Sequence, residues 1–411
     1  MIADVLTAGP NLPVEEWRQL VRRAIFDHCK WDAQCGDHAV LARFPLFVDS
    51  STVNSLGSMA ERLSAEAFAA ELEILNKPEL LRQLSLPRKI RRVVEQAGAE
   101  NNSPSHVRVM RFDFHYTRDG WRISEVNADV PGGYVEGAGW NELLSHEFCG
   151  VKCPPSPTRA YVAAIAERVP PGSLIALAHA TVYSEDRQVM VHLGKEMKRQ
   201  GLNPCLVSPA QIRWTRGQAS LETNFARGNP ALIVRLLPAE WLPSVCPDEM
   251  WGPWFRESET LLSNPGCALA LQSKRFPLVW ERLATDLKTW RQLLPASRCP
   301  SEIDESPEYV LKPALGRVGE DVGIRGVTDE EAYRGILRSA GAHPARWVAQ
   351  RRFETVPVPT EDGPVYPCIG VFTVNGRMAG LYGRAAFSPL VDENALDVAV
   401  LVREQPARSI R

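Results

Sequence analysis

Four side chains able to bind a metal ion or an anion fall within the stretch RFDFHYTRDGWRISEVNAD, residues 111–129. Arg111 and Asp113 stand two positions apart, and so do Glu125 and Asn127. Because side chains i and i+2 of a strand share one face, each pair points to one side, and the intervening Phe112 and Val126 point to a core.

The chemistry of these four residues suits a charged substrate. Two carboxylates and an amide are the hard oxygen ligands that Mg²⁺ prefers, and an arginine fits a phosphate or an acyl oxyanion. A surface hairpin with charge pairs across its strands is the alternative. The irregular stretch ADVPGG that follows Asn127 favours a site, since a plain exposed hairpin does not need it.

A second candidate begins at YVLKPA, where a β-rich run ends at Lys312 and a loop with Gly316, Gly319 and Gly323 follows. A lysine is a suitable charge for nucleotide phosphates, and glycines let backbone N–H groups approach them. The loop has neither the G-K-[ST] ending of a Walker A motif nor a Rossmann fingerprint. An ordinary connecting loop is the alternative.

Hydrophobic periodicity predicts the elements that position these residues. The candidate hairpin has a four-residue loop, TRDG, and a second hairpin turns at Asn375–Gly376. Helices are predicted over residues 14–30, 55–75, 184–201 and 329–340, and further strands over residues 173–180, 231–238, 309–314 and 346–353. The pattern is an α/β fold with a mostly helical N-terminal part, because the character changes at residue 106 and strands alternate with helices over about residues 170–240.

Composition excludes several classes of partner. The 411 residues are 45% hydrophobic and 23% charged with a net charge of −2, so nothing favours nucleic acid or an anionic membrane. No apolar run of roughly 18 residues predicts a transmembrane helix, and the N-terminus does not resemble a secretory signal. Nine scattered cysteines suit a reducing cytosol, so we expect a cytoplasmic protein. The sequence carries no signal for an oligomeric state.

The order R-x-D, E-x-N and then K-P with a glycine-rich loop resembles the glutathionylspermidine synthase family. The segments WDAQCGD, SKRFPLVWERL, WVAQRRFE and AGLYGRAAF extend the resemblance over residues 15–400. It implies a circularly permuted ATP-grasp fold. It also implies three parts: a helical part over residues 1–105, a metal-binding hairpin with a substrate-binding region over residues 106–265, and a nucleotide-binding region over residues 266–411.

The resemblance also implies roles for individual residues. Asp113, Glu125 and Asn127 would bind Mg²⁺, and Arg111 and Arg384 would hold the reactive phosphate. The ATP-binding residues would be Lys274, Lys312, Gly316, Gly319 and Gln350, with Gln350 at the adenine. Lys288 is an alternative to Lys274. Glu185 and Asp186 fall where the family has acidic residues near the substrate; the alternative is an acidic pair that stabilises a helix N-terminus.

The reaction implied is ligation of a carboxylate to an amine, with ATP and Mg²⁺ consumed through an acyl phosphate and ADP released. The substrates would be a small-molecule or peptide acid and an amine. The segment ADVPGGYVEGAG departs from the family, because it lacks the Ser or Thr that could serve glutathione. The alternatives are a non-catalytic nucleotide-binding protein and an ATP-dependent phosphotransferase of the same fold.

Overall fold

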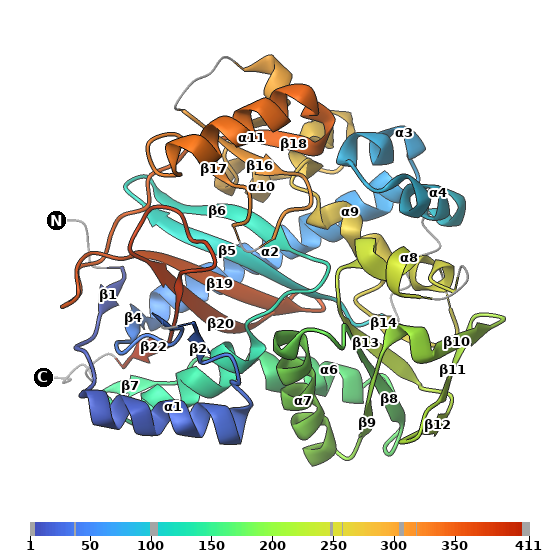
Figure 1. Cartoon of the computed structure of the whole chain (residues 1–411), viewed down its shortest axis with the longest axis horizontal. Helices are drawn as coiled ribbons and strands as arrows, with labels where there is room; N and C mark the ends of the chain where they lie inside the picture. The colour runs from blue at the N-terminus through green and yellow to red at the C-terminus, as the bar shows by residue number, and fades with distance from the viewer. Residues whose placement is uncertain are drawn as a thin grey trace, which may run out of the picture.

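A five-stranded antiparallel sheet occupies the centre of the molecule (Figure 1). The computed structural model describes residues 5–36, 38–98, 106–246, 250–256, 258–303, 308–317 and 319–404. The strands of the central sheet, in spatial order, are β21 (Leu396–Val398), β20 (Arg377–Ala386), β19 (Tyr366–Val374), β5 (Val109–Thr117) and β6 (Gly120–Asn127). The sheet therefore joins two segments that lie far apart in the sequence. The division of the chain into three parts stays a prediction.

The hairpin of β5 and β6 has the face pattern that the sequence predicts. Arg111 stands opposite Asn127 and Asp113 opposite Glu125, so all four share one face, and Phe112 pairs with Val126 on the other. The predicted four-residue loop was wrong. Strand pairing continues to Thr117 and Gly120, because the Thr117 hydroxyl donates to the Gly120 carbonyl at 2.6 Å and closes a two-residue turn.

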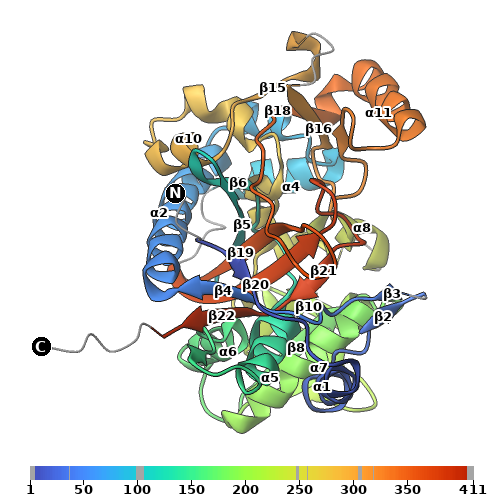
Figure 2. The same cartoon turned by 90° about the vertical axis from the view of Figure 1, so that its left-hand side faces the viewer.

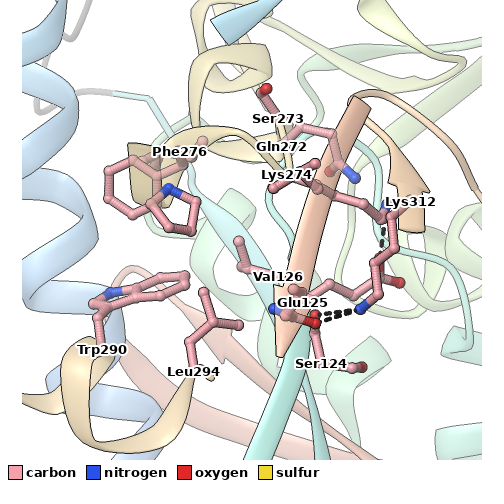
Figure 3. A pocket seen from close by; sticks show the side chains of 14 residues that line it. Ser124, Glu125, Val126, Gln272, Ser273, Lys274, Phe276, Trp290, Leu294 and Lys312 are labelled. Carbon is pink, nitrogen blue, oxygen red and sulfur yellow. Dashed lines mark hydrogen bonds and ion pairs between the residues drawn. The ribbon is translucent and has the colours of Figure 1, made fainter. Parts of the chain in front are cut away.

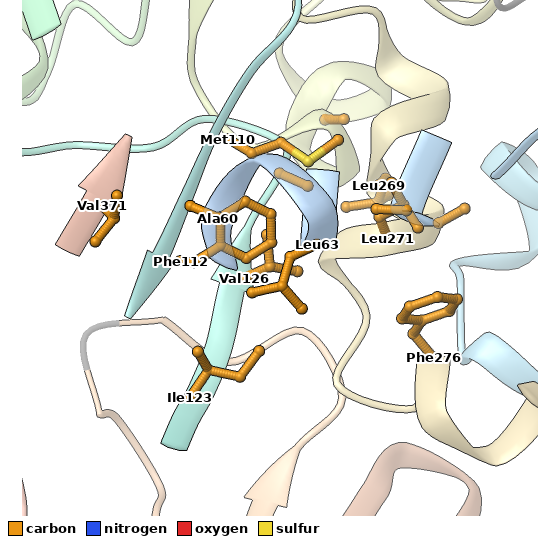
Figure 4. Packing of buried hydrophobic residues seen from close by; sticks show 14 of the residues in the cluster. Ala60, Leu63, Met110, Phe112, Ile123, Val126, Leu269, Leu271, Phe276 and Val371 are labelled. Atoms are coloured by element: carbon orange, nitrogen blue, oxygen red, sulfur yellow. The ribbon is translucent and has the colours of Figure 1, made fainter. Parts of the chain in front are cut away.

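The long helix α2 (Ser50–Leu75) covers the apolar face of the central sheet. Figure 4 shows Ala60 and Leu63 of this helix close to Phe112 and Val126 of the sheet. The helix begins before the predicted position because its N-cap is Asp49, whose carboxylate accepts a hydrogen bond from the Thr52 backbone at 2.6 Å. One face of the sheet is thus buried against a helix, and the other carries the charged residues.

A separate parallel sheet follows in the middle of the chain, as the alternation of strands and helices predicts. Its spatial order is β14 (Leu261–Ser263), β13 (Leu232–Leu236), β8 (Leu174–His179) and β9 (Asn203–Val207). Helices α6 (Pro157–Ala166) and α7 (Ser184–Arg199) lie beside it in Figure 1. The predicted closure near Gly201 is confirmed, since this glycine has a φ of 76° just after α7.

A small antiparallel sheet lies above the central sheet in Figure 2. Its strands, in spatial order, are β15 (Ser297–Arg298), β18 (Trp347–Arg351), β16 (Tyr309–Pro313) and β17 (Gly323–Ile324), and α11 (Glu330–Ala342) packs against them. Strand β16 ends one residue after Lys312, and the glycine-rich loop then leads to β17. The loop therefore leaves the small sheet on the side of the central sheet.

The N-terminal part is mostly helical, as predicted. Its helices are α1 (Val14–His28), α2, α3 (Pro78–Leu81) and α4 (Arg88–Ala97). Strands from the first and last parts of the described chain share one sheet. Its spatial order is β1 (Thr7–Ala8), β4 (Leu46–Asp49), β22 (Val400–Arg403) and β7 (Val151–Lys152). The remaining strands and α-helices of the described residues are β2 (Gln34–Cys35), β3 (His38–Ala39), α5 (Asn141–Ser145), β10 (Ile212–Thr215), β11 (Gln218–Glu222), β12 (Arg227–Gly228), α8 (Leu242–Val245), α9 (Leu269–Gln272) and α10 (Lys288–Leu293). Within the described ranges, no helix has the length and apolar character needed to span a bilayer.

Candidate active site

Arg111 and Asp113 form a buried ion pair on the charged face of the central sheet. Arg111 Nε lies 2.7 Å from Asp113 Oδ1, and Nη2 lies 2.9 Å from Oδ2. Arg111 Nη1 also donates to the Gly132 carbonyl at 2.7 Å. Burial alone would lower the pKa of Arg111, but the neighbouring carboxylate outweighs that effect and raises it. The ion pair holds the permanently charged guanidinium of Arg111 in a fixed orientation.

Glu125 and Asn127 extend this face along β6. The amide nitrogen of Asn127 donates to Asp113 Oδ2 at 3.1 Å. Glu125 Oε2 lies 2.8 Å from Lys274 Nζ. Burial would raise the pKa of Glu125, and the charges of Lys274 and Lys312 lower it to about 2. The carboxylate of Glu125 is therefore ionised over the whole physiological range.

Two lysines approach this face from different elements. Lys274, just after α9, donates to the Gly316 carbonyl at 2.5 Å, which ties it to the glycine-rich loop. Lys312 of β16 donates to Gln350 Oε1 at 2.6 Å and to the Ser124 carbonyl at 3.1 Å. Burial lowers the pKa of Lys312 to about 8, although Glu125 partly opposes the shift. A buried ammonium with neutral partners can gain further stabilisation from an anion.

Glu125, Lys274 and Lys312 line an open cavity between the central and the small antiparallel sheets, with a volume of about 350 Å³ that includes its mouth. Arg111, Asp113 and Asn127 are not part of its lining. Figure 3 shows Glu125, Lys274 and Lys312 on one side of it and Phe276, Trp290 and Leu294 on the other. Gln350 also contributes to the lining. The alternative cation Lys288 is exposed at the start of α10 and does not line this cavity. One end of the cavity is thus charged, and the opposite wall is apolar and aromatic.

Arg384 belongs to the same sheet as Arg111 but lies on β20. It stands opposite Cys368 on β19 and Asp397 on β21. Its guanidinium donates to the Asp392 backbone carbonyl. Gly319 of the glycine-rich loop packs against the same residue, because a Cβ at Gly319 would lie 2.9 Å from Asp392 Cα. The structure therefore places Arg384 beside this loop and two strands from Arg111.

Glu185 and Asp186 occupy the first turn of α7 and do not line the cavity. Burial and then the neighbouring Glu185 raise the pKa of Asp186 to about 7. Arg317 of the glycine-rich loop is close enough to lower this pKa in part. Asp186 thus lies within electrostatic range of the loop, and Glu185 is exposed.

A network that sequence reasoning missed joins the loop to the rest of the site. Arg317 Nη2 lies 3.2 Å from Asp129 Oδ2 and 2.9 Å from Glu240 Oε1. Asp129 Oδ1 is in turn 2.5 Å from Arg235 Nη2, with both side chains fully buried. Asp129 ends the candidate stretch of residues 111–129, and Arg317 lies in the glycine-rich loop after Lys312. The position of each residue in a candidate motif was therefore a signal. No local pattern marks Glu240 or Arg235.

The oxygen donors fit Mg²⁺ by their chemistry. Within the described residues no three His, Cys, Asp or Glu side chains gather as a metal-holding group. Asp113 and Glu125 supply two carboxylates, and Asn127 supplies an amide oxygen. Mg²⁺ typically takes only one or two carboxylates and completes its octahedron with waters and substrate phosphates, so this donor set is sufficient.

The arrangement of helices and sheets is that of an α/β protein with an ATP-grasp-like fold. The chain belongs to the family described as glutathionylspermidine synthase preATP-grasp, which matches residues 11–403. A synthetase-type ligase is the class that this membership supports.

Two further comparisons complete the picture. A solved structure described as "Putative gamma-glutamylcysteine synthetase" from Methylobacillus flagellatus KT is 14% identical, with a TM-score of 0.44. The match covers 81% of this chain and 84% of that one. No curated protein matches the chain.

Proposed function

We propose that the protein is an ATP- and Mg²⁺-dependent ligase that joins a carboxylate to an amine through an acyl phosphate and releases ADP. The observation that carries this proposal is the cavity between the two sheets, where Glu125, Lys274, Lys312 and Gln350 converge. The buried Arg111–Asp113 pair shares the face of Glu125. The same cavity therefore offers charged groups for the phosphates of a nucleotide and an apolar wall for its base.

The nucleotide would occupy this cavity. Its phosphates would accept from Lys274 and Lys312, which now donate to neutral carbonyl and amide oxygens and to Glu125. The base would lie against Phe276 and Trp290, with Gln350 supplying a polar contact. Phosphoryl transfer needs positioning and positive charge more than covalent help from the protein, and these residues provide both.

Asp113, Glu125 and Asn127 would hold Mg²⁺. When bound, the ion would neutralise charge on the phosphates during transfer. In the structure Asp113 is paired with Arg111 and Glu125 with Lys274, so a bound Mg²⁺ would replace part of these contacts. Lys274 is then free to turn from Glu125 toward a phosphate.

Arg111 and Arg384 would stabilise the intermediate. The substrate carboxylate attacks the γ-phosphorus and ADP leaves, which forms an acyl phosphate. The amine nitrogen then attacks the acyl carbon, loses a proton, and expels phosphate. Fixed guanidinium groups stabilise the charge that develops on the phosphate and acyl oxygens.

The acid and the amine would enter from the parallel-sheet side, where Glu185 and Asp186 occupy the first turn of α7. An acidic pair suits a cationic amine. Glutathione as the acid is not favoured, since residues 128–139 carry no Ser or Thr hydroxyl. We also propose that the protein acts in the cytoplasm. Its chain would comprise a helical, a substrate-binding and a nucleotide-binding part.

An ADP-release screen over pairs of carboxylates and amines, with mass spectrometry of the product, tests the proposal. A ligase releases ADP only when acid and amine are both present, and yields an amide. Release that needs one acceptor alone would instead identify a phosphotransferase. Nucleotide binding without release under any pair would identify a non-catalytic binding protein. Glu125→Gln serves as the inactive control.

A further inference from the structure

A buried lysine lies behind the proposed reaction centre and holds three carboxylates. Lys30 follows α1 and is only 2% exposed. Its Nζ lies 2.5 Å from Glu136 Oε1, 2.8 Å from Asp397 Oδ2 and 2.9 Å from Asp32 Oδ1. Burial would lower the pKa of Lys30, but Asp397 and Glu136 raise it well above its usual value. The ammonium is therefore permanently charged and fixes Asp397.

Tyr382 continues this chain of contacts toward the charged face of the central sheet. Its hydroxyl donates to Asp397 Oδ1 at 2.6 Å, and the residue is 8% exposed. Gly133 packs against the ring: a Cβ there would lie 2.7 Å from the Tyr382 ring, and its φ is 94°. A glycine is thus required for this close approach. Asp397 therefore holds the Tyr382 hydroxyl, and Gly133 packs against one face of the ring.

This series of contacts ends at Arg111, the arginine of the proposed reaction centre. Arg111 Cζ lies 5.1 Å from the centre of the Tyr382 ring, within the range of a cation–π contact. The aliphatic part of Arg111 crosses Gly370, where a Cβ would lie 2.8 Å from Arg111 Cδ. Asp113 and the Gly132 carbonyl fix the polar edge of the guanidinium, and Tyr382 supports it from a different side.

We propose that Tyr382, held by Asp397 and Lys30, is a positioning residue that orients Arg111 for the acyl phosphate. This inference rests on the proposed function. A guanidinium that must meet a developing oxyanion has to be held close to its productive geometry, and supporting contacts typically do this. The segment around Lys30, in the N-terminal part of the chain, thereby becomes part of the catalytic apparatus without touching substrate.

The test removes one hydroxyl and keeps the ring. Tyr382→Phe cuts the link to Asp397, and Tyr161→Phe is the matched control. Tyr161 is 3% exposed and its hydroxyl hydrogen-bonds Ser263 Oγ at 2.7 Å, so it loses a comparable contact elsewhere. With an acid and amine pair found by the ADP-release screen, Tyr382→Phe should lower kcat by about tenfold and leave the KM for ATP within about twofold. Tyr161→Phe should change neither.

A readout that needs no turnover separates this inference from the proposed function. The Arg111 Nε–H group, hydrogen-bonded to Asp113, should give a protected ¹⁵N–¹H signal that is assigned by its loss in Arg111→Lys. Tyr382→Phe should shift or broaden this signal, and Tyr161→Phe should leave it unchanged. An unchanged Arg111 signal in Tyr382→Phe, or equal kcat effects of the two variants, would overturn the inference. If no substrate pair turns over, the ligase proposal fails and the Arg111 signal alone decides the positioning role.

Discussion

At the scale of the residue, charge on Lys312 depends on whether an anion is bound. Burial lowers the pKa of Lys312 to about 8, from a usual value of 10.5. Above that pH the amine is neutral in the free protein. Bound phosphates favour the charged form and raise the pKa again. The proposed nucleotide binding would therefore be linked to protonation of this one residue.

We expect MgATP binding to take up close to one proton at about pH 9 and almost none at about pH 7, where Lys312 is already charged. Affinity should accordingly fall as the pH rises through the pKa of the free lysine. Calorimetry in buffers of different ionisation enthalpy measures the uptake. The arginine of Lys312→Arg is charged at both pH values, so this variant should bind MgATP without taking up a proton. The same uptake in wild type and variant would place the titrating group elsewhere.

Glu125 and Phe112 offer a contrast between chemistry and stability on one hairpin. Glu125→Gln keeps the size and removes the charge, so ADP release should fall by about a hundredfold or more, as for other damaged metal sites. Phe112 is fully buried beneath α2. Phe112→Ala should lower the free energy of unfolding by about 3–5 kcal/mol through the cavity it leaves. Turnover and chemical denaturation of both variants test this; wild-type turnover in Glu125→Gln would remove the hairpin from the site.

At the scale of the element, the glycine-rich loop connects the proposed nucleotide side of the site to the proposed substrate side. Arg317 holds it to Asp129 and Glu240, Gly316 accepts from Lys274, and Gly319 packs on Asp392. Loops that cover phosphates typically become ordered when the ligand binds. Opening of the loop must break these contacts. We therefore expect a bound nucleotide to make opening less frequent.

Trypsin reports this opening, because it cleaves after Arg317 only when that side chain leaves its carboxylate partners. We expect ATP with Mg²⁺ to slow this cut, since loop opening becomes less frequent. Glu240→Gln should speed it without ATP, because Arg317 loses one charged partner. The cut after Arg216, exposed in the turn between β10 and β11, is the internal control and should not change. Nucleotide-independent cleavage after Arg317 would mean that this loop does not cover the phosphates.

Local elements were predictable from the sequence because strand alternation and helix periodicity are local. The face shared by Arg111, Asp113, Glu125 and Asn127 followed from the period of two in a strand. The pairing of β5 with β19, more than 200 positions later, has no local signal. For the same reason Lys30 and Tyr382 escaped notice: their partners Glu136 and Asp397 become neighbours only after the whole chain has folded.

At the scale of the whole molecule, the proposed nucleotide site draws on several distant segments. The hairpin supplies Glu125, the segment after α9 supplies Lys274, and the small antiparallel sheet supplies Lys312 and Gln350. A ligand that bridges them binds the folded state and not the unfolded chain. It therefore stabilises the protein by mass action, by about 2.7 kcal/mol when its concentration is 100 times the Kd.

MgATP should accordingly raise the melting temperature, and Lys312→Ala and Lys274→Ala should each lose most of that rise. Lys288→Ala is the matched control, since it removes an exposed lysine of the same region and should keep the full shift. Differential scanning calorimetry with and without MgATP measures all four proteins. Melting of each variant without nucleotide shows whether the fold itself is intact. If Lys288→Ala loses the shift and Lys274→Ala keeps it, the phosphate-binding lysine is Lys288, and the cavity between the two sheets is not the nucleotide site in the form proposed.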